Sequence, residues 1–424
     1  MVYKLSKYNL IYENKKYSLI YNPIKGGILR FPPNFSEEDI KNLDNKLLTL
    51  LKEYGIIVDS EKNEGLEFFS YSNKNRINSD TLFLTIAPTL LCNFNCYYCF
   101  QNINKISETN EQFYGDLINF IKNAETEYKK IDITWYGGEP LLEFDKIEKI
   151  TFEILKILGD QKRLSASIVT NGYYLDNDKI EKFAALNITR AQVTLDGSRK
   201  RHNLIRYTLN SNSGSFDKIV KNISDASESI DIDLRVNIND YDLEDFKLLI
   251  DEIKEFNLSN RVNIYVSRLD NINGTCSNAK IGDDYKTLYR RAYEIIIENG
   301  LRSGYFPIPK FSICQAVCNH TVVIGPDGKL YKCINDIGKS NMIVGDLHNG
   351  VNDTSTILYK YLNYSIPNIC MGCKMLPTCV GGCPSKNLFG KNENFECSKD
   401  SLTDQENFNI IMRKLMEGNK NEST

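Results

Sequence analysis

The chain has 424 residues, enough for two or three domains with cores of their own, and its apolar fraction of 42% is that of an ordinary globular protein. A formal net charge of −3 argues against a broadly basic nucleic-acid-binding protein, and no apolar run reaches the roughly 18 residues that a bilayer-spanning helix needs. Because the N-terminus also lacks the apolar stretch of a signal peptide, we expect a cytoplasmic protein with neither nucleic acid nor a membrane as partner.

The first 80 residues have the pattern of a small α+β module. Two short strand patterns flank a polar turn at Glu13-Asn14, and an amphipathic stretch predicts a helix that begins at Ser36 and ends at Gly55. The polar run over 70–80 is typical of a linker, which would lead into the next domain.

From residue 81 to 305, strand and helix patterns alternate in six repeats. Such βα units imply parallel strands with crossover helices, and six units are too few for a complete eight-unit barrel. The sequence therefore predicts an α/β fold, a partial (β/α)6 TIM-like barrel with its chemistry at the carboxyl ends of the strands. The predicted strands cover 81–88, 130–136, 165–171, 189–196, 231–238 and 261–269, and the predicted helices 112–125, 143–158, 177–186, 215–229, 242–256 and 283–299.

Residues 306–424 are expected to form a third, cysteine-rich domain. Regular structure is sparse there, so bound metal would replace part of a hydrophobic core. The stretch 322–333 has the pattern of a hairpin with Asp327-Gly328 at its turn, and 402–418 that of an amphipathic helix that packs back on the body. Twelve cysteines in a reducing compartment favour metal or redox chemistry, and three histidines without an H-E-x-x-H motif argue against a His-based zinc hydrolase.

Three cysteines, Cys92, Cys96 and Cys99, follow the first predicted barrel strand in a C-x3-C-x2-C run. A four-iron cluster normally takes four thiolates, so three would leave one iron open to a substrate or cofactor. Zinc is the competing interpretation, but zinc sites usually pair two short cysteine motifs and no fourth ligand lies nearby. Three buried thiols without a metal are the remaining alternative. The sequence "GGEP" (137–140) follows the second strand and should share the same face.

This cysteine spacing after a strand resembles the signature of the radical S-adenosylmethionine (SAM) enzymes, and "TWYGGEPLL" and "VTLDG" with His202 and Arg206 also resemble that family. The resemblance implies a [4Fe-4S] cluster on Cys92, Cys96 and Cys99 that cleaves SAM to methionine and a 5′-deoxyadenosyl radical, which then takes a hydrogen atom from a substrate C–H bond. It further implies that a set of residues contacts the cofactor: Tyr98, Gly137, Gly138, Glu139, Pro140, Thr194, Arg206 and Arg235.

The later cysteines match the spacing of the SPASM extension of these enzymes; a zinc ribbon would explain four of them and not seven. The resemblance implies two auxiliary [4Fe-4S] clusters, three clusters in all. Cys318, Cys333 and Cys383 would hold a proximal cluster, with Cys314 or a substrate thiolate as its fourth ligand. A distal cluster would use Cys370, Cys373, Cys379 and Cys397. Cys276 matches no motif, and we expect a free loop thiol, with substrate handling as the alternative.

SPASM enzymes mostly modify peptides or proteins, and many peptide maturases carry an N-terminal winged-helix-like domain that receives a leader peptide as an added strand. Residues 1–80 fit that domain in size and pattern. We therefore expect an enzyme that installs a crosslink, a Cys sulfur-to-carbon thioether, in a ribosomally made precursor, with an electron donor such as flavodoxin or ferredoxin. Alternatives are a carbon–carbon crosslink, formylglycine formation, and a non-enzymatic Fe–S electron carrier. One residue argues against formylglycine formation. In sulfatase maturases, an Asp that acts as a base directly follows the cysteine that matches Cys333, whereas this chain has Ile334 there.

Overall fold

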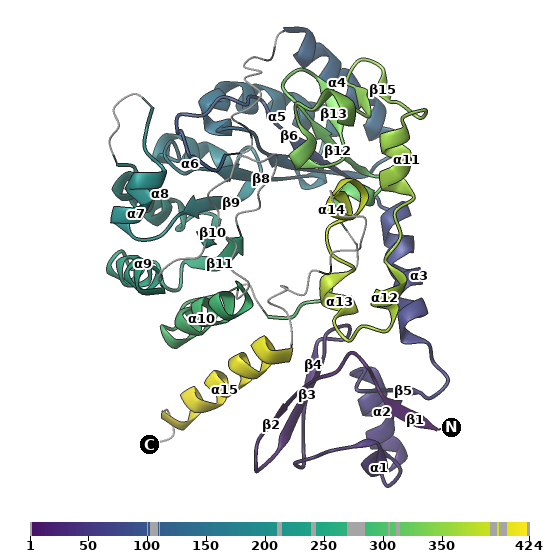
Figure 1. The fold of residues 1–424 in the computed structure, drawn as a ribbon. Helices are drawn as coiled ribbons and strands as arrows, with labels where there is room; N and C mark the ends of the chain where they lie inside the picture. The colour runs from purple at the N-terminus through teal and green to yellow at the C-terminus, as the bar shows by residue number, and fades with distance from the viewer. Residues whose placement is uncertain are drawn as a thin grey trace. The chain divides into compact units, whose positions relative to one another are not determined.

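The computed structural model of the protein describes residues 2–99, 101, 109, 111–209, 214–238, 243–268, 285–303, 306–310, 314–390, 397 and 405–421 (Figure 1). The chain forms two compact units, and both are discontinuous in sequence. The first combines Met1–Ile77 with Tyr305–Cys314 and Tyr364–Thr424, and the second combines Asn78–Gly304 with Gln315–Asn363. Among the described helices, none has both the length and the apolarity that crossing a membrane requires.

The second unit is built on a ten-stranded sheet, and its six predicted parallel strands are confirmed. They are β6 (Thr81–Ile86), β7 (Lys130–Trp135), β8 (Leu164–Thr170), β9 (Ile188–Leu195), β10 (Asp231–Ile238) and β11 (Val262–Arg268). The predicted hairpin is also confirmed, as β12 (Thr321–Ile324) and β13 (Lys329–Tyr331). The sequence did not reveal that β12 continues the sheet by pairing in parallel with β6. Two short strands, β14 (Gly345–Asp346) and β15 (Gly350–Val351), end the row.

The six predicted crossover helices form where expected, because each carries an apolar stripe that the sheet buries. They are α4 (Glu111–Glu125), α5 (Phe144–Leu158), α6 (Asn177–Phe183), α8 (Phe216–Ala226), α9 (Leu243–Glu255) and α10 (Tyr285–Glu298). Sequence patterns missed α7 (Arg199–Ile205), a helix of two turns that is too short for a clear periodicity. Figure 1 shows these helices along one side of the curved sheet.

Alternate residues of the parallel strands face two different environments. On β7 and β10, Ile133, Trp135 and Leu234 lie on the face that the helices bury, and each is 0% exposed. The residues between them, such as Thr134 and Arg235, are only half-buried. The sheet thus has one apolar face and one polar face, as a barrel that is open on one side requires.

The N-terminal residues of the first unit form the expected α+β module. Three antiparallel strands, β2 (Leu10–Glu13), β3 (Ser18–Asn22) and β4 (Gly27–Phe31), lie beside a short pair, β1 (Tyr3–Leu5) with β5 (Ile57–Asp59). The turn after Glu13 is confirmed, but the helix expected over 36–55 is two helices, α1 (Glu37–Ile40) and α2 (Asn45–Glu53). The break follows because the Asp44 side chain accepts from Leu47 N at 2.8 Å and starts a new helix.

The predicted linker over 70–80 is wrong. Most of it belongs to α3 (Glu64–Ile77), a helix whose Phe68 and Ser72 are buried. Tertiary packing of those side chains outweighs the weak helix propensity of the Ser and Asn residues that suggested a linker.

The C-terminal part of the first unit has short helices around its cysteines, α12 (Asn368–Met371), α13 (Leu376–Cys379) and α14 (Pro384–Phe389), after α11 (Thr356–Leu362) of the second unit. The predicted C-terminal helix is confirmed as α15 (Gln405–Asn421), and it packs on β2 and β3. Gln405 exchanges two hydrogen bonds with the backbone of Ile11, at 3.0 and 2.8 Å. Phe408 stacks on Tyr21 with ring centroids 5.6 Å apart.

Candidate active site

The cysteine loop that follows β6 partly buries its thiols. Cys96 is 7% exposed, and the Cys92 sulfur accepts from Phe94 N at 3.4 Å. The Asn171 side-chain amide lies 3.8 Å from the same sulfur. Burial raises the pKa of Cys92 to about 12 and that of Cys96 to about 11, so both thiols hold their protons until a metal displaces them.

The "GGEP" loop is bonded directly to the cysteine loop. Gly138 N donates to Thr89 O at 3.1 Å and Glu139 N to Leu91 O at 2.9 Å. A Cβ on Gly138 would lie 2.2 Å from Leu91 O, and Gly137 has a φ of +128° that side-chain-bearing residues avoid. The two glycines therefore bring two loops together, and Pro140 begins the single 3₁₀ turn that follows. Contact of these residues with a cofactor stays a prediction.

Glu139 is 0% exposed and ties three segments together. Its carboxylate accepts from Leu141 N at 3.0 Å, from the Thr170 hydroxyl at 2.7 Å and from Asn171 N at 2.7 Å. Burial raises the pKa of Glu139, while these hydrogen bonds oppose that rise. In this structure the carboxylate fixes the loops after β7 and β8; its predicted contact with the cofactor is untested.

Arg206 lies in a buried polar network beside the cysteine loop, and its guanidinium carbon is 5.6 Å from the centroid of the Phe94 ring. Its guanidinium donates to the Tyr98 hydroxyl at 2.6 Å and lies 3.3 Å from the Asp196 carboxylate. Asn237 donates to the other oxygen of Asp196 at 2.9 Å, and Tyr98 also bonds to Asp196. The network joins the cysteine loop to the carboxyl ends of β9 and β10.

His202 supports this network as a neutral side chain. Its Nδ1 accepts from Asp196 N at 3.2 Å, and its Nε2 lies 3.0 Å from the Ser215 hydroxyl, which donates to Arg206 O. Burial, then the charge of Arg206, holds the pKa of His202 well below its usual range. Protonation would place a hydrogen on Nδ1, against the N–H of Asp196. His202 thus has a structural role, which is to hold the loop after β9 against Ser215.

This burial predicts a pH dependence of stability. Because the folded pKa of His202 lies below the unfolded value of about 6.5, the unfolded chain binds the extra proton, and stability falls as pH drops below about 6.5, by up to about 1.4 kcal/mol per pH unit. Denaturant unfolding between pH 5 and 8 would measure this slope. His202→Asn should flatten it by one proton, and a slope in this variant equal to that of the wild-type protein would refute the assignment.

Thr194 and Arg235 are register neighbours on the polar face of the sheet. Arg235 Nε donates to Asn237 Oδ1 at 2.9 Å. Its positive charge opposes the rise in pKa that burial gives the Tyr136 hydroxyl, and negative charge on Cys99 and Cys333 adds to that rise. Tyr136, which sequence patterns did not single out, therefore lies near a cysteine of the first loop and a cysteine of the β12–β13 hairpin.

Four cysteines of the first unit are assigned to a distal cluster, and their grouping as its ligands stays a prediction. Burial raises the pKa of Cys370 to about 11, and negative charge on Cys379, Cys373 and Cys397 contributes to the rise. The Cys373 sulfur accepts from Met375 N at 3.4 Å. After Cys379, Val380, Gly381 and Gly382 all have positive φ (55°, 81° and 82°). Burial raises the pKa of Cys379, and the N–H groups of Gly381 and Gly382, bonded to its sulfur, oppose that rise.

The residues assigned to the proximal cluster are divided between the two units. Cys318, 2% exposed, and Cys333 belong to the second unit, and Cys314 and Cys383 to the first. Their grouping stays a prediction, and Cys276 lies outside the described residues. No disulfide joins any of the described cysteines, and no three of the described His, Cys, Asp or Glu side chains are preset at metal-binding geometry.

The donor set fits the groups that the cysteine motifs imply. Arg206 Nε and Asn93 Nδ2, beside the first loop, are buried without a hydrogen-bond partner among the described residues, so donors remain for a ligand rich in oxygen acceptors. Backbone N–H groups already point at the sulfurs of Cys92, Cys373 and Cys379, which is the environment that iron-bound thiolates prefer.

Several supporting residues escaped sequence reasoning. Asn171 and Asp196 each stand at the carboxyl end of a predicted strand, in "VTNG" and "VTLDG", so position alone marks them as site residues. Val380 gives no signal in the sequence, because its left-handed backbone, unusual for a branched side chain, is imposed by the cysteine loop.

Comparison with known proteins gave matches over most of the chain. The model of the family described as the radical SAM superfamily matches residues 86–304, just over half of the chain. Radical SAM cyclopropyl synthase TigE of Paramaledivibacter caminithermalis is 23% identical over 89% of this chain and 84% of its own. Mycofactocin maturase MftC of Mycolicibacterium smegmatis is 23% identical over 72% of this chain and 79% of its own.

Solved structures share the fold. Native anSMEcpe with bound AdoMet superposes with a TM-score of 0.62 at 16% identity, over 80% of this chain and 99% of that one. SuiB of Streptococcus suis, bound to its precursor peptide SuiA, superposes with a TM-score of 0.56 at 16% identity, over 94% of this chain and 99% of that one.

Proposed function

Because the chain belongs to the radical SAM superfamily, we propose that it is a peptide maturase that binds the leader of a ribosomally made precursor and oxidatively installs a thioether between a Cys sulfur and a carbon. TigE and MftC, similar over most of their length, and SuiB, solved with a precursor peptide, support a peptide substrate. The three-domain division at residues 80 and 305, and the winged-helix-like and SPASM identities of the terminal domains, belong to the same proposal.

The observation that carries the peptide substrate is the edge of the N-terminal sheet. Among the described strands, β4 pairs with β3 alone, so the other side of β4 offers its N–H and C=O groups to an added strand. Ile28, 41% exposed, and the exposed Arg30 lie on this strand and offer one apolar and one cationic contact. Backbone hydrogen bonds with β4 would supply the affinity for a leader bound here, and contacts with Ile28 and Arg30 would supply the specificity.

At the first cysteine loop, each part of the proposed site has a task. When bound, the cluster and SAM supply a 5′-deoxyadenosyl radical that abstracts hydrogen. Cys92, Cys96 and Cys99 would hold the cluster, and Glu139 fixes the loops around it. Arg206 keeps one donor for the SAM carboxylate, and Thr194 and Arg235 line the polar face beyond it. These contacts support a site whose residues are positioned by a rigid sheet.

The two auxiliary clusters would accept the second electron that a crosslink releases. Each crosslink removes two hydrogen atoms from the peptide, and the hydrogen abstraction accounts for only one electron. The sequence spacing of Cys370, Cys373, Cys379 and Cys397, and the influence of the last three on the pKa of Cys370, support a second cluster in this role. A flavodoxin or ferredoxin would supply the electron that starts the reaction.

A carbon–carbon crosslink is the second candidate, because the relative TigE is described as a cyclopropyl synthase. Formylglycine formation is less well supported, although anSMEcpe shares the fold. Ile334 follows Cys333 directly, and the nearest carboxylate after it, Asp336, is 3% exposed and bonded to the Tyr361 hydroxyl at 2.8 Å. The segment from Ile334 to Asp336 therefore offers no solvent-exposed carboxylate that could act as a base.

Production together with a small cysteine-rich peptide encoded beside the enzyme tests the proposal. We expect the peptide to lose the mass of two hydrogen atoms per crosslink, with one thiol consumed for each. The same loss with all thiols still alkylatable would favour carbon–carbon bonds. An unmodified peptide, and no 5′-deoxyadenosine from protein with intact clusters, would instead support an electron carrier.

A further inference from the structure

The N-terminal module packs directly on the turn between Cys370 and Cys373, inside the first compact unit. The Lys7 ammonium donates to the carbonyl oxygen of Met371, which lies in that turn, at 2.5 Å. On α3, a Cβ added to Gly65 would lie 2.5 Å from the same oxygen. Backbone of α3 in the module therefore packs closely against backbone of the cysteine turn.

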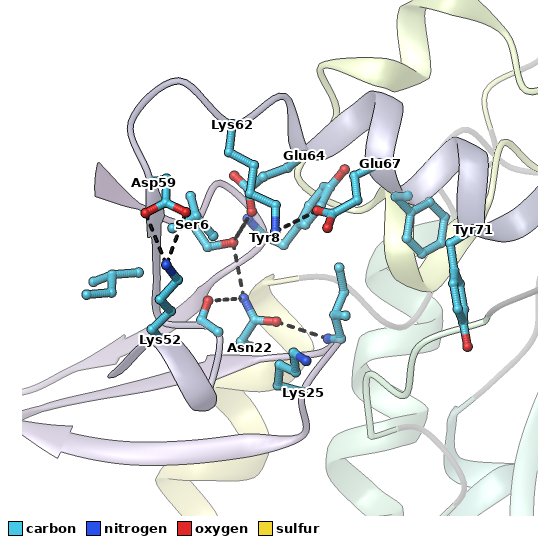
Figure 2. Close-up of a pocket in the computed structure, with 15 residues that line it drawn as sticks. Ser6, Tyr8, Asn22, Lys25, Lys52, Asp59, Lys62, Glu64, Glu67 and Tyr71 are labelled. Carbon is cyan, nitrogen blue, oxygen red and sulfur yellow. Dashed lines mark hydrogen bonds and ion pairs between the residues drawn. The ribbon is translucent and has the colours of Figure 1, made fainter. Parts of the chain in front are cut away.

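Tyr8, next to Lys7, has a hydroxyl that the described residues leave unused. The side chain is 0% exposed, and its oxygen has no hydrogen-bond partner among them. The ring packs edge-on against Phe68, with centroids 6.3 Å apart, on the wall of a cavity of about 360 Å³. Figure 2 shows Tyr8 among Ser6, Glu64 and Glu67. A buried hydroxyl without a partner costs about 1–3 kcal/mol, so its retention points to a partner that arrives later.

The ring lies beside the cysteine turn, because the Lys7 ammonium that bonds to Met371 O is 5.0 Å from the centroid of the Tyr8 ring. Burial raises the pKa of Tyr8, and negative charge on Glu64, Cys373 and Glu67 raises it further, in that order. The two carboxylates are already engaged, Glu64 by Ser6 and the Lys7 backbone and Glu67 by Lys62 at 2.7 Å. Cys373 lies two residues after Met371, and its sulfur accepts the backbone N–H of Met375, so an iron-bound thiolate there has room for a further donor.

We propose that Tyr8 and Lys7 are positioning residues of the distal auxiliary cluster. The Tyr8 hydroxyl donates a hydrogen bond to the sulfur of Cys373 once that sulfur is an iron-bound thiolate, and Lys7 fixes the Cys370–Cys373 turn through Met371 O. This inference rests on the proposed function, because it requires the distal cluster. It gives the N-terminal module a second task, which is to complete the surroundings of a redox centre.

Both groups should raise the reduction potential of the distal cluster. Hydrogen bonds to cluster sulfurs and nearby positive charge stabilise the reduced state, which carries one more negative charge. The ammonium of Lys7, 5.0 Å from the centroid of the Tyr8 ring, adds to the effect of the hydroxyl.

Redox titration of the reconstituted full-length protein, followed by electron paramagnetic resonance, tests this. Tyr8→Phe keeps the ring in the core, so we expect unchanged iron content and a lower midpoint potential for one auxiliary cluster. Lys7→Met should lower the same potential, and Lys7→Arg should restore it. Tyr17→Phe, on a ring stacked against Arg30 away from the cysteine turn, is the matched control.

Two outcomes would overturn the inference, and both are distinguishable from failure of the proposed function. If all cluster potentials of Tyr8→Phe and Lys7→Met equal those of Tyr17→Phe, the clusters exist and the positioning role is wrong. If the wild-type protein holds iron for the first cysteine loop alone, the distal cluster itself is absent.

Discussion

Replacing Cys92, Cys96 and Cys99 together by Ala should abolish the production of 5′-deoxyadenosine from SAM. These thiols are the candidate ligands of the cluster that binds SAM, and without thiolates the iron has no attachment there. The C-terminal cysteines should keep their iron, so about a third of the iron should be lost and about two thirds retained, for clusters of equal size. Iron analysis and chromatography of the reaction products measure both.

Cys276→Ala is the matched control, because it removes a thiol that belongs to no motif. It should retain wild-type iron content and SAM cleavage. Cleavage that persists in the triple variant would show that the reaction site lies elsewhere. Loss of all iron would instead show that the three cysteines are needed for the fold.

Glu139→Gln should destabilise the protein by about 2–4 kcal/mol and reduce SAM cleavage by about tenfold or more. The carboxylate accepts from three buried donors, and the amide of Gln would face one of them, Asn171 N, with its own N–H. The same residue, Asn171, also approaches the Cys92 sulfur, so displacement of this loop reaches the candidate cluster ligand.

Urea unfolding of the metal-free protein measures the first effect, and the rate of 5′-deoxyadenosine formation measures the second. Glu153→Gln removes an exposed carboxylate paired with Lys156 on α5, and should change stability by less than about 1 kcal/mol. Equal stability of the two variants would remove Glu139 from its structural role.

The barrel strands were predictable because two local signals, the alternation of apolar residues and the turn residues that follow, indicate the same strand boundaries. Burial alternates along β7, β8 and most of β9, and each of these strands is followed by a glycine-containing turn of the candidate site. The cysteine motifs were readable for the same reason, since metal ligands require fixed residue types at fixed spacing. These features are local in sequence.

Features that depend on distant contacts were not predictable. The parallel pairing of β12 with β6 joins segments more than 200 residues apart, and nothing in either strand specifies the other. The hydrogen bonds of Glu139 to Thr170 and Asn171 are also invisible in sequence, where "GGEP" suggested contact with a ligand instead. The polar residues of α3 led to the wrong prediction of a linker, because tertiary packing, which the local sequence does not show, decides their burial.

The discontinuity of both compact units has a consequence for how the protein is made. A ribosome adds roughly 5–20 residues per second, so β6 would wait roughly 10–50 s for β12. During that time one side of β6 has no neighbour, beside the thiols of the cysteine loop. The N-terminal module waits longer still for α15, which packs on β2 through Gln405, 394 residues after its partner Ile11. Iron insertion into the complete sites would thus follow synthesis of these distant segments, and folding would be slow and sensitive to oxidation.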